Sequence, residues 1–277
     1  MSENASAEKR ILQDSPRLGL DDRFTFRCGR DLDCFTRCCH DVSILLTPYD
    51  VLRMKRALHL DSSEFLERYT FVMQSRDSKA PVIFLQMKAE NQTCPFVSEQ
   101  GCGIYAHRPW ACRMYPLGMA EPKDPQAAAQ RFYFQVHEEL CHGHGVGNGC
   151  SVRDWIEEQG IEAFELNQAS FRQLMSHPGW DNPEPLTPDK LAMFYMAAYD
   201  LDRFRRFVFD TRFLELIDVD EARIEALRSD DEELLEFAMD WLMFSLFQER
   251  KRMKLTKSAK LSEAARTTAA EAANASL

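Results

Sequence analysis

The residues best suited to chemistry in this 277-residue sequence are its nine cysteines. Four of them fall in the stretch FRCGRDLDCFTRCCH, which runs from Phe26 to His40. These four and four later cysteines lie beside glycine, proline and charged residues rather than on apolar faces, which favours ligands over small core residues. We therefore predict eight metal-binding thiolates: Cys28, Cys34, Cys38, Cys39, Cys94, Cys102, Cys112 and Cys141.

The double cysteine limits how these ligands can be shared. Side chains of the neighbours Cys38 and Cys39 point in different directions in most backbone conformations, so they are poorly placed around one tetrahedral ion. Eight thiolates are the number that two centres of four would need, and Cys150 lies outside this count. The stretch from Phe26 to His40 is thus expected to be half of a split site, which the later cysteines complete.

The spacing of the cysteines bears on the metal. The sequence has neither the two Cys-x2-Cys pairs of zinc ribbons nor the Cys-x2-Cys-x2-Cys run of bacterial ferredoxins. Thiolates suit both zinc and iron. The irregular spacing and the double cysteine favour an iron–sulfur cluster, expected as 4Fe-4S, and zinc stays the alternative.

Other polar side chains near the cysteines could assist. Arg108 and Arg113 flank Cys112 and are our candidate cofactor-binding residues, because a guanidinium can bind a carboxylate or offset the charge of thiolates. In a sulfur-rich site, offsetting the charge of the thiolates is the more common role of such an arginine. No catalytic residue is assigned. Each of three histidines could add a nitrogen ligand or could face solvent instead: His40, His142 and His144. Tyr105 and Tyr115 are expected to serve packing.

Composition restricts the partners. The formal net charge of −10 argues against general binding to nucleic acid or anionic lipid and favours a basic protein partner or substrate. The run Arg203-Phe-Arg-Arg-Phe-Val-Phe is expected to be a core helix with a solvated basic face, rather than a surface that stacks on bases.

No apolar segment approaches the length of a membrane span, and the first residues lack the apolar region of a signal peptide. We therefore expect a cytoplasmic protein that does not contact a membrane. In that reducing compartment, cysteines serve metal binding or catalysis more often than disulfides. The sequence does not determine the oligomeric state.

The elements that must position the cysteines are short. Strands are predicted over residues 42–46, 81–87 and 131–136. Helix start signals occur at Thr47, Asp61, Ser151 and Thr187, and we expect the helices to run to about His59, Val72, Leu166 and Val208. Two more helices are predicted over 220–227 and 231–248, and loops over 122–130 and 178–188.

The expected fold is α+β and mainly helical, with a small irregular cysteine-rich core organised by metal and an all-α C-terminal region. Its predicted parts are a flexible lead-in (1–20), a cysteine-cluster domain (21–150), a helical extension (151–250) and a disordered tail (251–277).

The cysteine pattern resembles that of the zinc- or iron-chelating proteins of the YkgJ type, whose domain is related to one in flagellin lysine N-methylases. The shared features are the clumped set that ends in Cys38-Cys39, Cys94-Pro-Phe96, the motif Cys-Gly-Ile-Tyr-x2-Arg-Pro-x2-Cys-Arg from Cys102 to Arg113, and Cys141 in a glycine-rich loop. The resemblance covers about residues 26 to 150. The distance from Cys28 to Cys34 is longer than in the family, and Cys150 has no counterpart there.

The resemblance implies metal chelation first. A second implication is a methyltransferase-like enzyme that uses S-adenosylmethionine to modify lysine in proteins, or a redox enzyme with an iron–sulfur cluster. The sequence has neither a Gly-x-Gly-x-x-Gly fingerprint nor the Cys-x3-Cys-x2-Cys motif of radical S-adenosylmethionine enzymes, so this enzyme reading rests on analogy. A third reading is a non-catalytic interaction module stapled by zinc.

Overall fold

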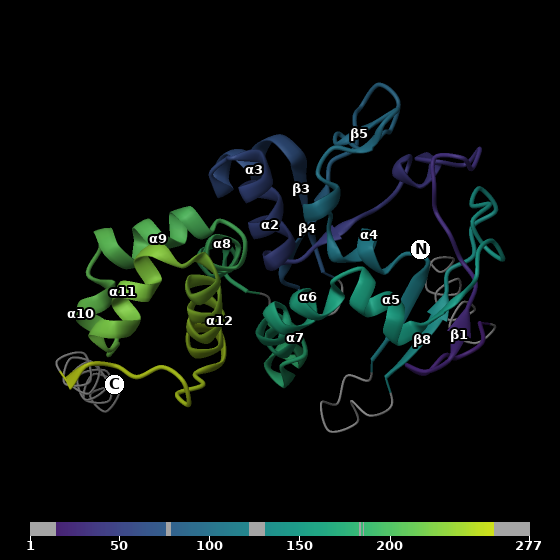
Figure 1. Ribbon diagram of the computed structural model, residues 1–277. Coiled ribbons are helices and arrows are strands. Elements are labelled where there is room, and N and C mark those ends of the chain that lie inside the picture. Colours follow the sequence, from purple (N-terminus) through teal and green to yellow (C-terminus); the bar gives the residue numbers. More distant parts are fainter. Residues whose placement is uncertain (1–14, 76–78, 122–130, 183, 185, 258–277) are drawn as a thin grey trace. The chain divides into compact units, whose positions relative to one another are not determined.

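The computed structural model describes residues 15–75, 79–121, 131–182, 184 and 186–257 (Figure 1). In this part the protein is of the predicted α+β class, with short strands in the cysteine-rich part and a helical region over residues 188–247. The chain divides into two compact units. The first comprises Met1–Leu60, Glu67–Met73 and Val82–Ala169, and the second comprises Asp61–Leu66, Gln74–Pro81 and Ser170–Leu277. The domain limits predicted from composition stay predictions.

Small antiparallel pairings draw distant parts of the cysteine-rich sequence together. The strands are β1 (Arg23–Phe24), β2 (Leu45–Leu46), β3 (Thr70–Gln74), β4 (Pro81–Leu85), β5 (Val97–Ser98), β6 (Gly101–Cys102), β7 (Leu117–Ala120), β8 (Phe132–Gln135) and β9 (Cys150–Ser151). They form a three-stranded sheet of order β2-β4-β3 and the pairs β1-β9, β5-β6 and β7-β8. In the pair β1-β9, Phe24 lies opposite Cys150.

Short helices complete the cysteine-rich part. They are η1 (Arg37–Cys39), α2 (Pro48–Leu58), α3 (Ser62–Tyr69), η2 (Tyr105–His107), α4 (Trp110–Met114), α5 (Val152–Glu158) and α6 (Ile161–Asn167). The predicted start of α2 is confirmed, because Thr47 and Asp50 form a reciprocal capping box. Ser151 and Asp154 form a second capping box at the start of α5.

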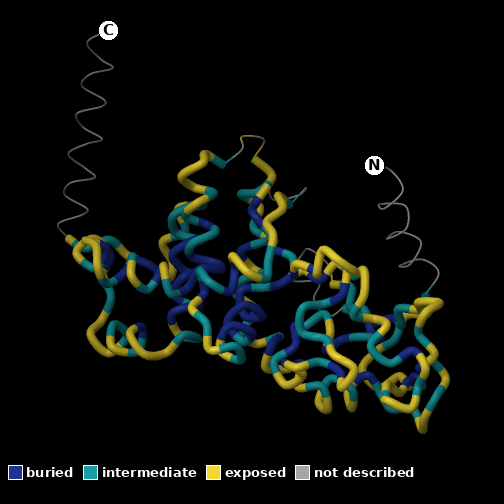
Figure 2. Tube along the Cα trace, turned by 90° about the horizontal axis from the view of Figure 1, so that it is seen from above, coloured by how far each residue is buried: buried dark blue, intermediate teal, exposed yellow. Residues whose placement is uncertain are grey.

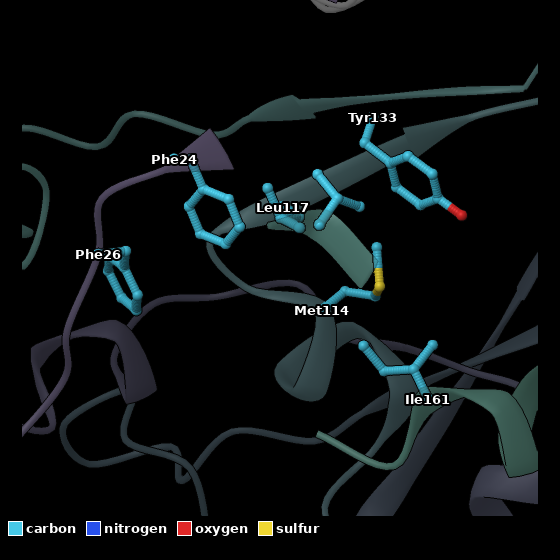
Figure 3. Packing of buried hydrophobic residues seen from close by; sticks show 7 residues of the cluster. Phe24, Phe26, Met114, Leu117, Tyr133 and Ile161 are labelled. Carbon is cyan, nitrogen blue, oxygen red and sulfur yellow. The ribbon is translucent and has the colours of Figure 1, made fainter. Parts of the chain in front are cut away.

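An apolar cluster of the first unit lies behind the cysteine loops. Seven buried residues form it, and six of them are labelled in Figure 3: Phe24, Phe26, Met114, Leu117, Tyr133, Val152 and Ile161. Tyr115 and Cys141 pack against this cluster. Since Phe26 precedes Cys28 by two residues and Met114 follows Cys112 by two, the core fixes the backbone on which both cysteines sit.

The second unit is helical. Its elements include α7 (Ala169–Met175), η4 (Pro178–Asp181), α8 (Pro188–Ala198), α9 (Leu201–Asp210), α10 (Phe213–Leu216), α11 (Glu221–Ser229) and α12 (Asp231–Phe247). Figure 2 colours the chain by burial. α9 has one buried face, formed by Leu201, Phe204 and Val208, as expected of an amphipathic helix, whereas α12 is buried without a break from Phe237 to Leu242. Phe204, Phe213 and Trp241 pack ring against ring in their core. In the described residues, no helix has the length and apolar character needed to cross a membrane.

The basic and aromatic run of α9 serves packing and helix capping. Phe204 and Val208 are fully buried, and Arg205 donates hydrogen bonds to the carbonyl oxygens of Leu227 and Arg228 near the end of α11. The expectation of a core helix with a basic outer face therefore fits the structure.

Two predicted helix ends are wrong. The helix that starts at Thr187 breaks after Ala198, because the buried Asp200 accepts hydrogen bonds from the hydroxyls of Ser62 and Ser63 and leads into a new helix. The helix that starts after Asp61 ends at Tyr69 rather than near Val72. The β-prone residues that follow form β3 instead.

The helix that starts after Ser151 was also predicted too long. It is interrupted at Gly160, which has a φ of 62°, and α6 follows. Leu166, expected on the apolar face, is 77% exposed. The strands and α-helices that were not predicted are β1, β3, β5, β6, β7, β9, α4, α7 and α10. Strands were predicted over 42–46, 81–87 and 131–136, of which the structure shows 45–46, 81–85 and 132–135.

The predicted terminal segments are partly ordered. Leu18, in the expected lead-in, forms a β-bridge with Tyr133. In the expected tail, Met253 is buried and Leu255 forms a bridge with Ile217. The predicted loop over 122–130, residues 1–14 and residues 258–277 lie outside the described part of the chain.

Candidate metal centre

The first four cysteines lie on a chain of tight turns. The amide of Arg37 donates to the carbonyl of Cys34, and the amide of Cys39 donates to that of Thr36. Thr36 has a φ of 68°, in the left-handed region that a β-branched residue rarely adopts. The double cysteine ends the short helix η1. The expectation that the two side chains diverge is wrong, because the thiols of Cys38 and Cys39 are close enough to form a hydrogen bond with each other.

The second group of cysteines is tied to the double cysteine through the backbone. The amide of Cys94 donates to the carbonyl of Cys39 at 2.8 Å, and His40 forms a bridge with Thr93. The hairpin β5-β6 then places Cys102 opposite Val97. This confirms a return of the chain to the first cysteines.

Cys112 is positioned by the short helix α4 and by a buried carboxylate. Oδ1 of Asp50, at the start of α2, accepts the amide of Trp110, the first residue of α4, at 2.8 Å. Asp50 is 1% exposed. The sequence identified Asp50 as a helix cap and gave no sign of this second contact, which spans 60 residues.

The loop that carries Cys141 lies against the segment before Cys28. The amide of Arg27 donates to the carbonyl of Gly143 at 3.1 Å, and Phe26 forms a bridge with His144. A Cβ atom at Gly143 would lie 2.5 Å from the carbonyl oxygen of Arg27, so this approach requires glycine. The amide of His142 points at the sulfur of Cys34, 3.3 Å away.

Mutual effects on pKa values suggest two overlapping groups among the eight predicted ligands. Burial, and then the neighbouring thiols of Cys38, Cys34 and Cys141, raise the pKa of Cys28. Burial, and then Cys94, Cys102, the carboxylate of Asp50 and Cys38, raise the pKa of Cys112 to about 12, so Cys38 acts on thiols of both groups. The four thiols Cys28, Cys34, Cys38 and Cys141 are called group A below, and Cys39, Cys94, Cys102 and Cys112 are called group B.

The double cysteine joins the two groups. A hydrogen bond between the two thiols lowers the pKa of Cys38 to about 7 and raises that of Cys39, whose pKa Cys94 and Cys112 raise further. Cys150 stands apart, since the groups that raise its pKa are, after burial, the carboxylates of Asp154 and Glu158. The thiols of Cys28, Cys39 and Cys112 are thus each influenced by other predicted ligands, whereas Cys150 is not, and the eight-ligand set stays a prediction.

The thiols within each group are more widely spaced than the ligands of one ion. Four thiolates at about 2.3 Å from a zinc ion lie within about 4 Å of one another. No three of the cysteine sulfurs, all of which the structure describes, lie within 4.8 Å of one another. Cys28 and Cys38 are exposed, so a metal can reach group A from solvent.

The two arginines near Cys112 are engaged with the backbone. Three nitrogens of the buried Arg113 donate to the carbonyls of Arg108, Gln159 and Ala106. Arg108 donates to the carbonyl of Tyr105 and lies over the ring of that exposed residue. These contacts fit the alternative in which the arginines support the cluster, and their binding of a cofactor stays a prediction.

The histidines lie in different settings. His40 is exposed. His142 is exposed too, and its Nδ1 lies 2.6 Å from Oδ1 of Asp33. The ring of His144 packs 4.3 Å from that of His137, and its nitrogens are buried without a hydrogen bond of normal geometry to any described residue. Burial lowers the pKa of His144.

Tyr115 is the predicted packing residue that lies closest to the thiols. Its ring packs on Phe26, and burial, followed by the thiol of Cys141, raises the pKa of its hydroxyl. Asp33 and His137 were not predicted as residues of the site. Asp33 directly precedes Cys34, but nothing in the local sequence shows that His142 lies beside it.

Comparison with known proteins identifies the cysteine-rich part. Residues 27–142 match the family model CxxCxxCC, described as "Putative zinc- or iron-chelating domain". This confirms the resemblance over these residues. A search of curated proteins and a search of solved structures each found no match.

Proposed function

We propose that residues 27–142, as a domain of the zinc- or iron-chelating family, bind metal through the eight thiolates of groups A and B, and that each group holds an iron–sulfur cluster. The observation that supports this proposal is that the thiols of groups A and B influence one another, with Cys38 acting on both groups, whereas no thiol acts on Cys150. Four thiolates are the usual ligand set of such a cluster.

The spacing of the thiols favours a cluster over a single ion. A cluster of several iron and sulfide atoms holds its thiolates farther apart than one zinc ion does, and no three of the cysteine sulfurs lie within 4.8 Å of one another. The 4Fe-4S type would use all four thiolates of a group.

The surroundings of the thiols fit bound thiolates. The amide of His142 points at Cys34, and Cys38 has a pKa of about 7, so both sulfurs are prepared to carry negative charge. Arg108 and Arg113, beside Cys112, supply positive charge close to group B. Clusters held in this way can serve electron transfer or hold the domain together.

Anaerobic purification, followed by visible absorption and by iron, sulfide and zinc analysis, tests the proposal. We expect a brown protein with iron and sulfide in equal amounts. Cys150→Ser is the matched control, since it removes the cysteine outside both groups and should leave the spectrum unchanged. A colourless protein with stoichiometric zinc would replace the clusters with zinc sites, and a protein without metal would contradict the proposal as a whole.

A further inference from the structure

A compact set of three different donor types lies at the edge of group A. Oδ1 of Asp33, the sulfur of Cys34 and a ring nitrogen of His142 all lie within 4.8 Å of one another. No other set of three such donors in the described residues is this compact. No three thiols of group A or group B lie this close together, so the set is a separate feature of the structure.

Two independent contacts fix the geometry of this set. His142 contacts Cys34 through its backbone amide, at 3.3 Å, and Asp33 through its ring, at 2.6 Å. The hydrogen bond from the amide of Arg27 to the carbonyl of Gly143 also joins the segment before Asp33 to the loop that carries His142. The three donors are therefore placed by the backbone and do not depend on long flexible side chains.

The donor chemistry suits zinc. Carboxylate oxygen, thiolate sulfur and imidazole nitrogen are the three kinds of ligand that zinc uses, whereas magnesium and calcium prefer oxygen alone. Asp33 and the Cys34 thiolate carry two negative charges, which match a divalent ion. Three protein ligands leave a fourth tetrahedral position, as in zinc sites that exchange water or bind a further ligand.

The exposure of the set is consistent with such an open site. The side chain of His142 is 48% exposed and that of Asp33 is 70% exposed, whereas Cys34 is buried. An ion there would face solvent on the side of the carboxylate and imidazole and would contact the cysteine core through sulfur.

We propose that Asp33, Cys34 and His142 form a further binding site for Zn2+, at the surface edge of group A and with one position open to solvent. The site shares Cys34 with group A, and to that extent it rests on the proposed function. A thiolate sulfur has lone pairs enough to bridge two metals. The ion would thus sit beside the metal of group A.

Zinc binding to the anaerobically purified protein with its resident metal tests this site. The variants are Asp33→Asn/His142→Asn and, as matched control, Glu139→Gln/His59→Asn, which removes an exposed acid two residues before Cys141 and an exposed histidine from a left-handed helix end that asparagine tolerates. In equilibrium dialysis we expect the wild type and the control to bind one Zn2+ more than the double variant, or to bind it at least tenfold more tightly.

Equal zinc binding in all three proteins would show that Asp33 and His142 are a surface hydrogen-bonded pair only and would overturn the proposal. X-ray absorption at the zinc edge should show one sulfur with nitrogen and oxygen neighbours, and a sulfur-only shell would also overturn it. The single variant Asp33→Asn, with unchanged circular dichroism, excludes a folding effect. Resident iron and visible absorption are recorded on the same samples, so a failure of the proposed clusters is seen separately.

Discussion

Asp50 has two roles, one in its own helix and one at the cysteine site. It caps α2 through Thr47 and accepts the amide of Trp110, which begins the helix that carries Cys112. The capping contact and the hydrogen bond of the Trp110 amide each contribute to stability, and loss of the Asp50 carboxylate leaves that amide unpaired. The residue therefore links helix formation to the position of a ligand.

We predict that Asp50→Ala lowers the free energy of unfolding by about 2–4 kcal/mol and reduces the metal bound by group B. Asp154→Ala is the matched control, because it removes the acid of the capping box at α5, which is exposed and makes no such distant contact. Urea unfolding and metal analysis of both variants measure the effects. Equal losses in the two variants would contradict a positioning role for Asp50.

The thiol of Cys38 should be the most reactive of the group in metal-free protein. Its pKa of about 7 means that about half of it is thiolate at that pH, and the thiolate is the reactive form. We predict that iodoacetamide modifies Cys38 with a half-maximal rate near pH 7, and that it modifies Cys112, whose pKa is about 12, far more slowly. Mass spectrometry of peptides across pH measures both rates. A half-maximal rate for Cys38 near pH 9 would contradict the hydrogen bond to Cys39.

At the scale of elements, the site depends on close contacts between loops that lie far apart in sequence. The Cys141 loop meets the Phe26–Cys28 segment at Gly143, where the two backbones approach too closely for a side chain. Gly145, two residues later, has a φ of 73° and open space around its Cα. The two glycines thus differ in what they contribute.

We predict that Gly143→Ala separates Cys141 from Cys28 and Cys34 and lowers the metal content of group A. Gly145→Ala should cost about 1–2 kcal/mol through its left-handed conformation and should leave the metal content unchanged. Metal analysis and thermal unfolding of the two variants provide the comparison. If both variants kept full metal, the contact at Gly143 would not position the site.

Local signals in the sequence predicted the elements whose causes are local. The capping boxes of Thr47 with Asp50 and Ser151 with Asp154 gave two helix starts correctly. The break at Asp200 could not be predicted, because its partners Ser62 and Ser63 lie far away along the chain. The clumping of cysteines likewise indicated the metal site, whereas the assignment of each thiol to a group needed the pairing of Cys94 with Cys39 and of Gly143 with Arg27.

At the scale of the whole molecule, the two units differ in what stabilises them. The helices α8, α9 and α12 contribute fully buried apolar residues such as Phe194, Phe204 and Phe237. The cysteine-rich part also has buried apolar residues, such as Leu52 and Met54 of α2, but its cysteines lie on strands of two residues, helices of three to five residues and turns. These short cysteine-bearing segments bury little apolar surface themselves, and bound metal can add on the order of 10 kcal/mol to folding.

We predict that removal of metal exposes the amides of residues 27–142 to solvent exchange and leaves those of α8 to α12 protected. Hydrogen exchange, measured by mass spectrometry on metal-loaded and metal-free protein, gives the protection of residues 27–142 and of α8 to α12 in the same experiment. Unchanged protection of residues 27–142 would contradict a structural role for metal in this domain.

The central claim is that two groups of four thiolates each hold a metal cluster. Native mass spectrometry of anaerobically purified protein tests it most directly, with Cys28→Ser for group A, Cys112→Ser for group B and Cys150→Ser as control. We predict the added mass of two clusters in the wild type and the control, and the loss of at least one cluster in each of the other variants. A wild-type mass with one metal ion, one cluster or no metal would contradict it.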